Sequence, residues 1–124
     1  MASVNQCALP DAVPAIRAAI SDFLDGLGVP ESQSADIKLA VSEAATNVVR
    51  HAYPGHPVGD IRCDGSAVDG TIVVSVCDWG RPFSEPTPNP GLGMGNPVME
   101  TLAAGVVRSQ IDGMKQVELT FIRR

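Results

Sequence analysis

Three polar side chains in the first half of the chain stand four residues apart, at Glu43, Asn47 and His51. On a helix this spacing puts them on one face, one turn after another, so that their heads could contact the same small object. Their neighbours are alanines and valines, whereas a solvated helix face usually carries lysine and glutamate. A capping or surface pair is the alternative interpretation, because side-chain hydrogen bonds at this spacing are common.

A second pair of residues with chemical potential is Asp78 and Gly80, directly after the apolar segment 71–77. A carboxylate at the end of a strand can accept a hydrogen bond from an exocyclic amine. A glycine two residues later leaves room for a flat ring beside the backbone. Asp-x-Gly is also an ordinary turn sequence, so a strand-terminating turn is the alternative.

A glycine run follows at Gly91, Gly93 and Gly95, where a short helix is expected to begin. Backbone amides at such a place form a cradle for an anion, assisted by the helix dipole. The run is not a dinucleotide-binding fingerprint, because a proline-rich loop precedes it and its third glycine comes one residue early. No Gly-Lys-Ser/Thr follows, which excludes a Walker A loop. A flexible hinge is the alternative.

Two elements must position these residues. An apolar stripe at helical spacing predicts a helix that begins at Ser32 or Ser34 and ends before Pro54-Gly55. The stripe consists of Ile37, Ala40, Val41, Ala44, Val48, Val49 and Ala52. The segment 71–77 is rich in β-branched residues and predicts a central strand that runs into Asp78.

The other elements complete a regular pattern. We expect an edge strand over 3–9, and a first helix with Asp11 as N-cap and Gly28 just beyond its end. Further strands are expected over 59–68, 106–111 and 116–122, with tight turns at Asp69-Gly70 and Asp112-Gly113, a proline-rich loop over 81–90 and a short helix through about Leu102. This order predicts a single domain over 1–124 with an α/β fold. It is a two-layer α/β sandwich with a mostly antiparallel mixed sheet and helices on one face.

The composition excludes some classes of function. The chain has 124 residues, 44% of them hydrophobic and 19% charged, which is ordinary for a globular domain with one core. A net charge of -5 argues against a direct nucleic-acid binder. Cys7, Cys63 and Cys77 have no metal-ligand spacing, and two of them lie in strand-like segments as small buried side chains. Reduced thiols, with no signal pattern and no membrane-length apolar run, predict a cytoplasmic protein.

Three motifs in this order resemble the boxes of the GHKL (histidine-kinase-like, Bergerat) ATPases. The segment 41–53, Val-Ser-Glu-Ala-Ala-Thr-Asn-Val-Val-Arg-His-Ala-Tyr, resembles their N box. Residues 76–80, Val-Cys-Asp-Trp-Gly, resemble the first glycine box, and residues 90–99 resemble the second. The short length, the Ser-Glu-Ala-x-Thr-Asn wording and the His-Ala-Tyr ending are similar to the anti-sigma factor serine/threonine kinase branch.

The resemblance implies a role for each matching residue. Asn47 would hold a Mg²⁺ ion that bridges the phosphates of ATP or ADP, and Glu43 would be the general base that takes a proton from a serine or threonine hydroxyl. Asp78 would accept from the adenine amino group while Gly80 lets the ring approach. The remaining positions implied for nucleotide contact are Arg50, His51, Gly91, Gly93, Met94 and Gly95.

The resemblance also implies partners, namely ATP, a sigma factor and an anti-sigma factor antagonist that is phosphorylated, and it extends loosely to a homodimer. The implied function is an ATP-binding anti-sigma factor with kinase activity in a partner-switching system. An arginine is common just before the second glycine box, but this chain has Pro90 or Gly91 there, and its nearest arginine is Arg81. We therefore expect either slow transfer or an arginine from elsewhere.

Two further departures concern the lid and the base. The lid is short and proline-rich, so incomplete closure over the nucleotide is expected. Where the family's closing hairpin often reads Gly-Thr-Thr, with a threonine near the adenine, residues 113–116 read Gly-Met-Lys-Gln. These departures keep two alternatives open: a nucleotide-dependent protein-binding switch with little turnover, and a small α/β domain whose motifs coincide by chance.

Overall fold

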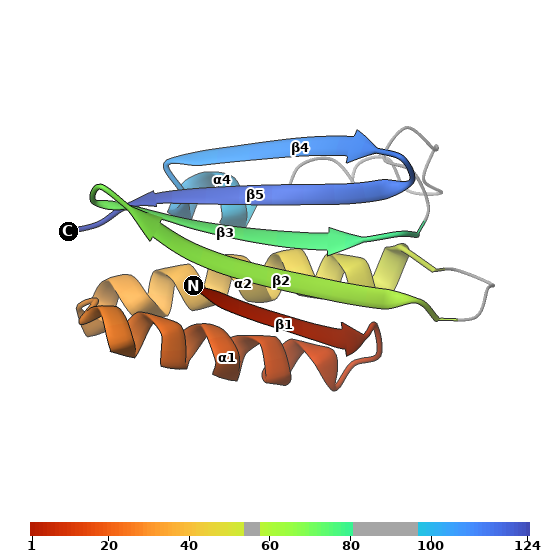
Figure 1. Cartoon of the computed structure of the whole chain (residues 1–124), viewed down its shortest axis with the longest axis horizontal. Helices are drawn as coiled ribbons and strands as arrows, with labels where there is room; N and C mark the ends of the chain where they lie inside the picture. The colour runs from red at the N-terminus through yellow and green to blue at the C-terminus, as the bar shows by residue number, and fades with distance from the viewer. Residues whose placement is uncertain (54–57, 81–96) are drawn as a thin grey trace.

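The computed structural model describes residues 1–53, 58–80 and 97–124. In chain order the described elements form a strand, two long helices, a hairpin, a short helix and a second hairpin (Figure 1). Their bounds are β1 (Ala2–Cys7), α1 (Ala12–Leu27), α2 (Glu31–His51), β2 (Asp60–Val68), β3 (Thr71–Asp78), α4 (Pro97–Leu102), β4 (Gly105–Ile111) and β5 (Met114–Ile122).

The strands form one five-stranded sheet with the order β1-β2-β3-β5-β4. Each neighbouring pair is antiparallel. The helices lie on one face of this sheet (Figure 1), which confirms the predicted two-layer α/β sandwich. β1 is an edge strand, as predicted, and β3 is central between β2 and β5. The strand that ends at Asp78 is therefore held from both sides.

Both hairpins turn at an Asp-Gly pair. Asp69 and Gly70 have φ values of 48° and 79°, and Asp112 and Gly113 have φ values of 53° and 82°. Two successive positive φ values are the signature of the tight turn that matches the twist of antiparallel strands. The two turns predicted from the sequence are confirmed, and they set the registers that pair β2 with β3 and β4 with β5.

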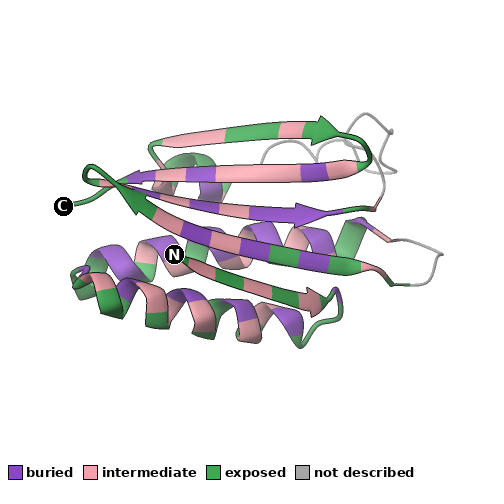
Figure 2. Ribbon diagram, in the orientation of Figure 1, coloured by how far each residue is buried: buried purple, intermediate pink, exposed green. Residues whose placement is uncertain are grey.

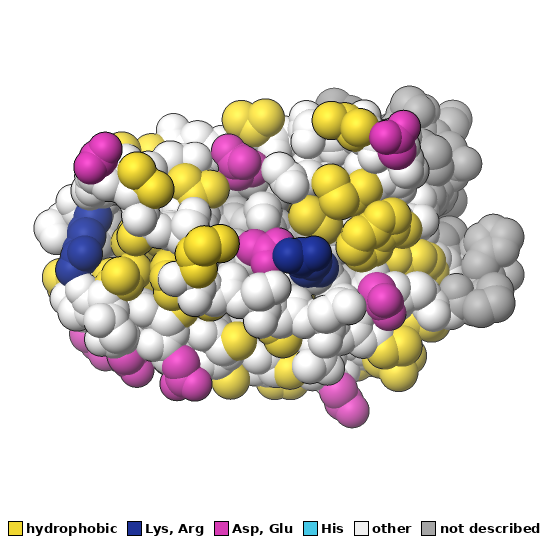
Figure 3. Space-filling view, viewed as in Figure 1, with side chains coloured by type: hydrophobic (Ala, Val, Ile, Leu, Met, Phe, Trp, Pro, Cys, Tyr) yellow, Lys and Arg dark blue, Asp and Glu magenta, His cyan; other side chains and the backbone are white. Residues whose placement is uncertain are grey.

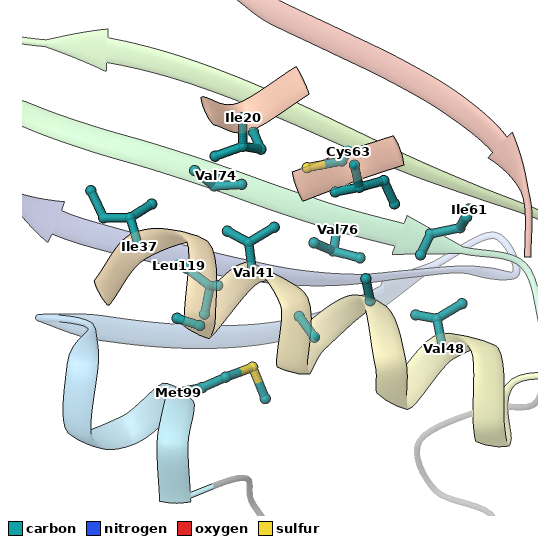
Figure 4. Packing of buried hydrophobic residues seen from close by; sticks show 14 of the residues in the cluster. Ile20, Ile37, Val41, Val48, Ile61, Cys63, Val74, Val76, Met99 and Leu119 are labelled. Carbon is teal, nitrogen blue, oxygen red and sulfur yellow. The ribbon is translucent and has the colours of Figure 1, made fainter. Parts of the chain in front are cut away.

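The core fills the space between the sheet and the helices. Along β2 and β3 buried residues alternate with more exposed ones, because successive side chains of a strand point to opposite faces (Figure 2). Figure 4 shows aliphatic side chains from α2, β3 and β5 converging, with Met99 of α4 beside them. Cys63 belongs to this core, and burial raises the pKa of its thiol to about 12. Cys77 is also buried, so both predictions for these thiols are confirmed.

Of three predictions about helix ends, one is wrong. Asp11 occupies the N-cap position of α1, as predicted, although its side chain makes no capping hydrogen bond. α2 begins at Glu31 rather than at Ser32 or Ser34, because extended Pro30 precedes it and accepts the Ser34 N–H at 2.9 Å. Gly28 ends α1 with a φ of 71°, as expected. The expected stop at Pro54-Gly55 lies outside the described residues.

The outer face of the sheet carries a mixed surface. It is turned toward the viewer in Figure 3, where hydrophobic patches are separated by charged side chains. One such charged pair joins Arg62 to Asp64 across 3.0 Å. Within the three described ranges, no helix is long and apolar enough to cross a membrane.

Candidate functional site

The second half of α2 presents the polar face predicted from the sequence. Glu43 and Asn47 are half-buried, and Arg50 and His51 are exposed near the end of the helix. At about 100° per residue, these four positions fall within an arc of about 100° on one side of the helix. The buried residues Val41, Ala44, Ala45 and Val48 occupy the opposite side and pack against the sheet. α2 therefore combines a core face with one continuous polar face.

The neighbouring helices α1 and α4 pack on other parts of α2 and not on this polar face. α1 lies along the flank that carries Lys38 and Ser42, which contact Ser21 at 3.5 Å and Arg17 at 3.3 Å. α4 packs against the first half of α2, where Leu102 and Ala103 line a cavity together with Ile37. The face with Asn47 lies beyond that contact, towards the end of the helix.

Asp78 is a buried carboxylate at the end of β3, with only 4% of its surface exposed. Its Oδ1 accepts the backbone N–H of Gly80 at 2.9 Å and lies 3.3 Å from Nζ of Lys115. Lys115 is the cross-strand partner of Asp78 in β5 and is itself buried. Burial raises the pKa of the Asp78 carboxyl, although the Gly80 N–H and the Lys115 ammonium act in the opposite direction.

Gly80 brings the end of β3 against the end of α2. A Cβ atom at this position would lie within 2.6 Å of the carbonyl carbon of Ala52, and closer still to its oxygen. The contact with the Ala52 backbone therefore requires glycine at position 80. From the sequence a different reason was expected for this glycine, namely room for a flat ring. The contact fixes Asp78 at the end of the molecule where α2 finishes. At a rise of about 1.5 Å per residue, Asn47 lies about 7.5 Å and Glu43 about 13.5 Å from Ala52 along the helix axis, towards the start of α2.

Tyr53 makes two hydrogen bonds that hold together the segments beside Asp78. Its hydroxyl donates to the carbonyl oxygen of Asp60 at 2.7 Å and accepts the N–H of Trp79 at 3.0 Å. One side chain thus joins the segment after α2, the start of β2 and the residue that follows Asp78. Burial raises the pKa of the Tyr53 hydroxyl, so it stays protonated and able to donate.

The donor set restricts the kind of metal site that could form here. In the part of the chain that the structure describes, no three His, Cys, Asp or Glu side chains gather as a metal cage would require. Asn47 supplies a hard oxygen donor on a half-buried face, one turn from the carboxylate of Glu43. Such a set fits a Mg²⁺ ion that takes one or two protein oxygens and the rest from phosphates and water.

Some predicted site residues are not tested. Gly91, Gly93, Met94 and Gly95 lie outside the described residues, as does Arg81. Of the others, Gly80 and Asp78 are brought directly to the end of α2, and Glu43, Asn47, Arg50 and His51 share its polar face.

Sequence interpretation missed the contacts that Lys115 and Tyr53 make at and beside Asp78. The last strand was expected to begin at Gln116, which left Lys115 outside the alternation. In the structure β5 begins at Met114, and Lys115 shares the inward side with Val117, Leu119 and Phe121. A charged residue in phase with three core residues was the available signal. Tyr53 was noted only as the end of a motif, and no pattern of spacing in the sequence predicts its two hydrogen bonds.

Comparison with known proteins places this chain in a family. The model of the histidine kinase-like ATPase domain matches residues 7–121. The serine-protein kinase RsbW of Bacillus licheniformis is 32% identical over 94% of this chain and 82% of its own length. An anti-sigma F factor of Clostridium botulinum is 33% identical over 73% of this chain and 71% of its own length.

Solved structures agree on the fold. The RsbU and RsbW domains of a Mycobacterium tuberculosis protein match with a TM-score of 0.73 at 24% identity, covering 99% of this chain and 33% of the other. The histidine kinase domain of a blue-light activated kinase from Erythrobacter litoralis matches with a TM-score of 0.64 at 23% identity, covering 90% of this chain and 59% of the other. The chain therefore belongs to the histidine kinase-like (GHKL) ATPase family, in the branch of the anti-sigma factor serine-protein kinases.

Proposed function

We propose that this protein is an ATP-binding anti-sigma factor that phosphorylates a serine or threonine of an anti-sigma factor antagonist, as part of a cytoplasmic partner-switching system. The observation that carries the proposal is the buried carboxylate of Asp78, held beside the end of a helix whose polar face carries Asn47 and Glu43. The names of the relatives, serine-protein kinase and anti-sigma F factor, support the same role.

The proposed site has one end that binds the adenine ring and another that binds the phosphates. Asp78 accepts a hydrogen bond from the adenine amino group at the end of β3. Asn47 would hold a Mg²⁺ ion, which would supply the positive charge that neutralises the phosphates. Arg50 and His51, exposed on the same face, can reach the phosphates.

The reaction is a phosphoryl transfer. The hydroxyl oxygen of the substrate bonds to the γ-phosphorus, the bond from that phosphorus to the β–γ bridging oxygen breaks, and ADP leaves. Glu43 takes the hydroxyl proton. Its half-buried position on α2, one turn from Asn47, suits a base that acts next to the phosphates.

A second candidate function is a nucleotide-dependent binding switch with little turnover. The absence of an arginine at Pro90 or Gly91 favours it, because the charge that develops on the transferred phosphoryl group usually needs a nearby cation. In this version ATP and ADP select between the sigma factor and the antagonist as partners. A homodimer belongs to either version and can be checked by analytical ultracentrifugation.

Nucleotide binding is tested by thermal unfolding with Mg-ATP and Mg-ADP. A ligand that binds only the folded state raises the melting temperature, so a shift is expected at millimolar nucleotide. Asn47→Ala should remove the part of this shift that depends on Mg²⁺. Asn5→Ala, at an exposed position of β1, is the matched control and should keep it. A wild-type protein without any shift would refute both candidate functions.

Catalysis is tested with labelled ATP and the antagonist, identified by mass spectrometry of co-purified proteins. Glu43→Gln should abolish phosphate transfer and leave the Mg-ATP shift almost intact. Glu31→Gln, at the exposed first turn of the same helix, should leave transfer unchanged. Undiminished transfer by Glu43→Gln would remove Glu43 as the base. Nucleotide binding without transfer in the wild type would select the switch.

A further inference from the structure

The ion pair between Lys115 and Asp78 is a feature that the proposed function does not explain. The ammonium and the carboxylate are 3.3 Å apart, with side chains only 10% and 5% exposed. Taking two charges out of water costs free energy, and replacing such a pair by apolar side chains of similar size is often neutral or stabilising. The neighbouring inward positions of β5, Val117 and Leu119, are apolar. Packing therefore gives no reason for a lysine at this position.

The two contacts of the Asp78 carboxylate within the described residues fall on the same oxygen. Oδ1 accepts from Gly80 and faces Lys115, so Oδ2 is the oxygen that these contacts leave for another donor. The ammonium next to Oδ1 is a strong donor of hydrogen bonds. The pair thus presents an acceptor and a donor side by side at the end of β3.

Adenine presents the complementary pair along its edge. Its exocyclic N6 amino group donates, and the adjacent ring atom N1 accepts. Hypoxanthine reverses both, because O6 accepts and N1–H donates. An acceptor at Oδ2 and a donor at Lys115 would therefore match adenine and oppose hypoxanthine in the same pose.

We infer that Lys115 is a specificity-determining residue that donates a hydrogen bond to N1 of the adenine whose amino group is bound by Asp78. This inference rests on the proposed function, since it requires that Asp78 contacts the base. Lys115 then supplies a direct, charged contact at the place where the family pattern often has a threonine.

The test uses ligands that differ by single atoms. Binding of ADP, 1-deaza-ADP (no N1 acceptor) and inosine diphosphate to the wild-type protein is measured by calorimetry with Mg²⁺. A hydrogen bond to a charged group contributes enough that removing N1 should weaken binding about ten- to a hundredfold. Inosine diphosphate should bind more weakly still, since it opposes both groups.

Variants assign the effect to Lys115. In Lys115→Met, ADP and 1-deaza-ADP should bind equally, both near the wild-type affinity for 1-deaza-ADP. Lys115→Gln keeps a neutral donor and should restore part of the preference for ADP. The only other lysine, Lys38, contacts Ser21 on the flank of α2 that faces α1, so Lys38→Met is the matched control and should keep the full preference.

The outcomes separate the two claims. Equal binding of ADP and 1-deaza-ADP by the wild-type protein would overturn the inference and leave ATP binding intact, even if Lys115→Met failed to fold. Tighter ADP binding by Lys115→Met would also overturn it, because the lysine would then compete with the base for Asp78. A wild-type protein that binds none of the three ligands would refute the proposed function itself.

Discussion

A buried polar side chain lies at each end of α2, Gln33 on the helix itself at the first end and Asp78 of β3 beside the second, and the two differ in their contacts. At the first end, Gln33 is 4% exposed; its Nε2 donates to the carbonyl oxygen of Ile122 at 2.7 Å, and its Oε1 accepts the N–H of Arg124 at 3.1 Å. Both polar atoms of the amide are thus bound to backbone groups at the end of β5 and just beyond it. At the second end, the protein contacts of Asp78 fall on Oδ1 alone within the described ranges.

The difference teaches that burial of a polar group does not by itself mark a binding site. The cavity at the first end has a volume of about 250 Å³ and is lined by Gln33, Ile37, Leu102, Phe121 and others. Its polar groups are paired within the chain, since Arg124 also contacts Asp36 at 3.4 Å. We therefore propose a structural role for the first end and a ligand-binding role for the second. Five predictions test this contrast.

The largest effect is expected for Lys115→Met. Removing one partner of a buried ion pair leaves an uncompensated charge, so the free energy of unfolding should fall by about 4 kcal/mol. Urea unfolding measures this change. The double variant Asp78→Leu/Lys115→Met should recover most of the stability while losing ADP binding, which would show that the pair serves a ligand. A single variant as stable as the wild type would contradict the burial of the pair.

Gly80→Ala tests the contact that joins the two elements of the site. Its Cβ would overlap the backbone of Ala52, and such overpacking should lower the free energy of unfolding by about 3 kcal/mol. Gly26→Ala is the control, because nothing lies within 4 Å of its Cβ position in α1. The control should stabilise the protein by about 0.5 kcal/mol. Equal effects of the two variants in urea unfolding would exclude the contact.

Gln33→Met tests the first end. Two backbone groups lose their partners, so the free energy of unfolding should fall by about 2 kcal/mol. ADP affinity, measured by calorimetry, should stay at the wild-type value because the change is at the far end of α2. A loss of ADP affinity comparable to that of Asp78→Leu would break the distinction between the ends.

Tyr53→Phe should change stability less than Gln33→Met does, but unlike Gln33→Met it should also weaken ADP binding. The lost hydroxyl contacts Asp60 and the N–H of Trp79, and its loss should lower the free energy of unfolding by about 1 kcal/mol. Because Trp79 follows Asp78 directly, ADP affinity should also fall severalfold. If calorimetry finds ADP affinity unchanged, Tyr53 is a fastening of the fold alone.

The smallest effect is a dependence of stability on pH at the second end. Burial raises the pKa of Asp78 in the folded state, so the folded protein holds this proton more tightly than the unfolded chain does. The corresponding stabilisation is complete below the unfolded pKa and is lost as the pH rises through the folded pKa. Asp78→Leu/Lys115→Met should lack this loss in urea unfolding from pH 4 upward, and Gln33→Met should retain it. Identical profiles for all three proteins would contradict the pKa direction.

The sequence predicted the elements that have strong local patterns. The β-branched segment that became β3, the apolar stripe of α2 and the two Asp-Gly turns are each determined by neighbouring residues, and each was found where expected. The polar face of α2 followed from the same periodicity. These features carry Glu43, Asn47 and Asp78, so most of the described site was predicted with the correct elements.

The remainder depends on contacts between distant segments. Lys115 meets Asp78 only because the register of β5 pairs them, and a strand start misplaced by two residues concealed this. The steric need for Gly80 comes from Ala52, and Tyr53 acts on Asp60 and Trp79. Local propensity contains no information about such partners, since they are set by how α2 docks on the sheet.

The position of β5 in the sheet has a consequence for biosynthesis. This strand lies between β3 and β4, yet it is the last of the five in chain order. On a ribosome, β3 therefore has an open edge until residues beyond 114 have emerged, and the Asp78 carboxylate waits without its cross-strand lysine. During this interval the nascent chain exposes one unpaired edge of a hydrophobic strand, and such an edge is a template for aggregation. The strand that completes the sheet is therefore the one that brings Lys115 to Asp78.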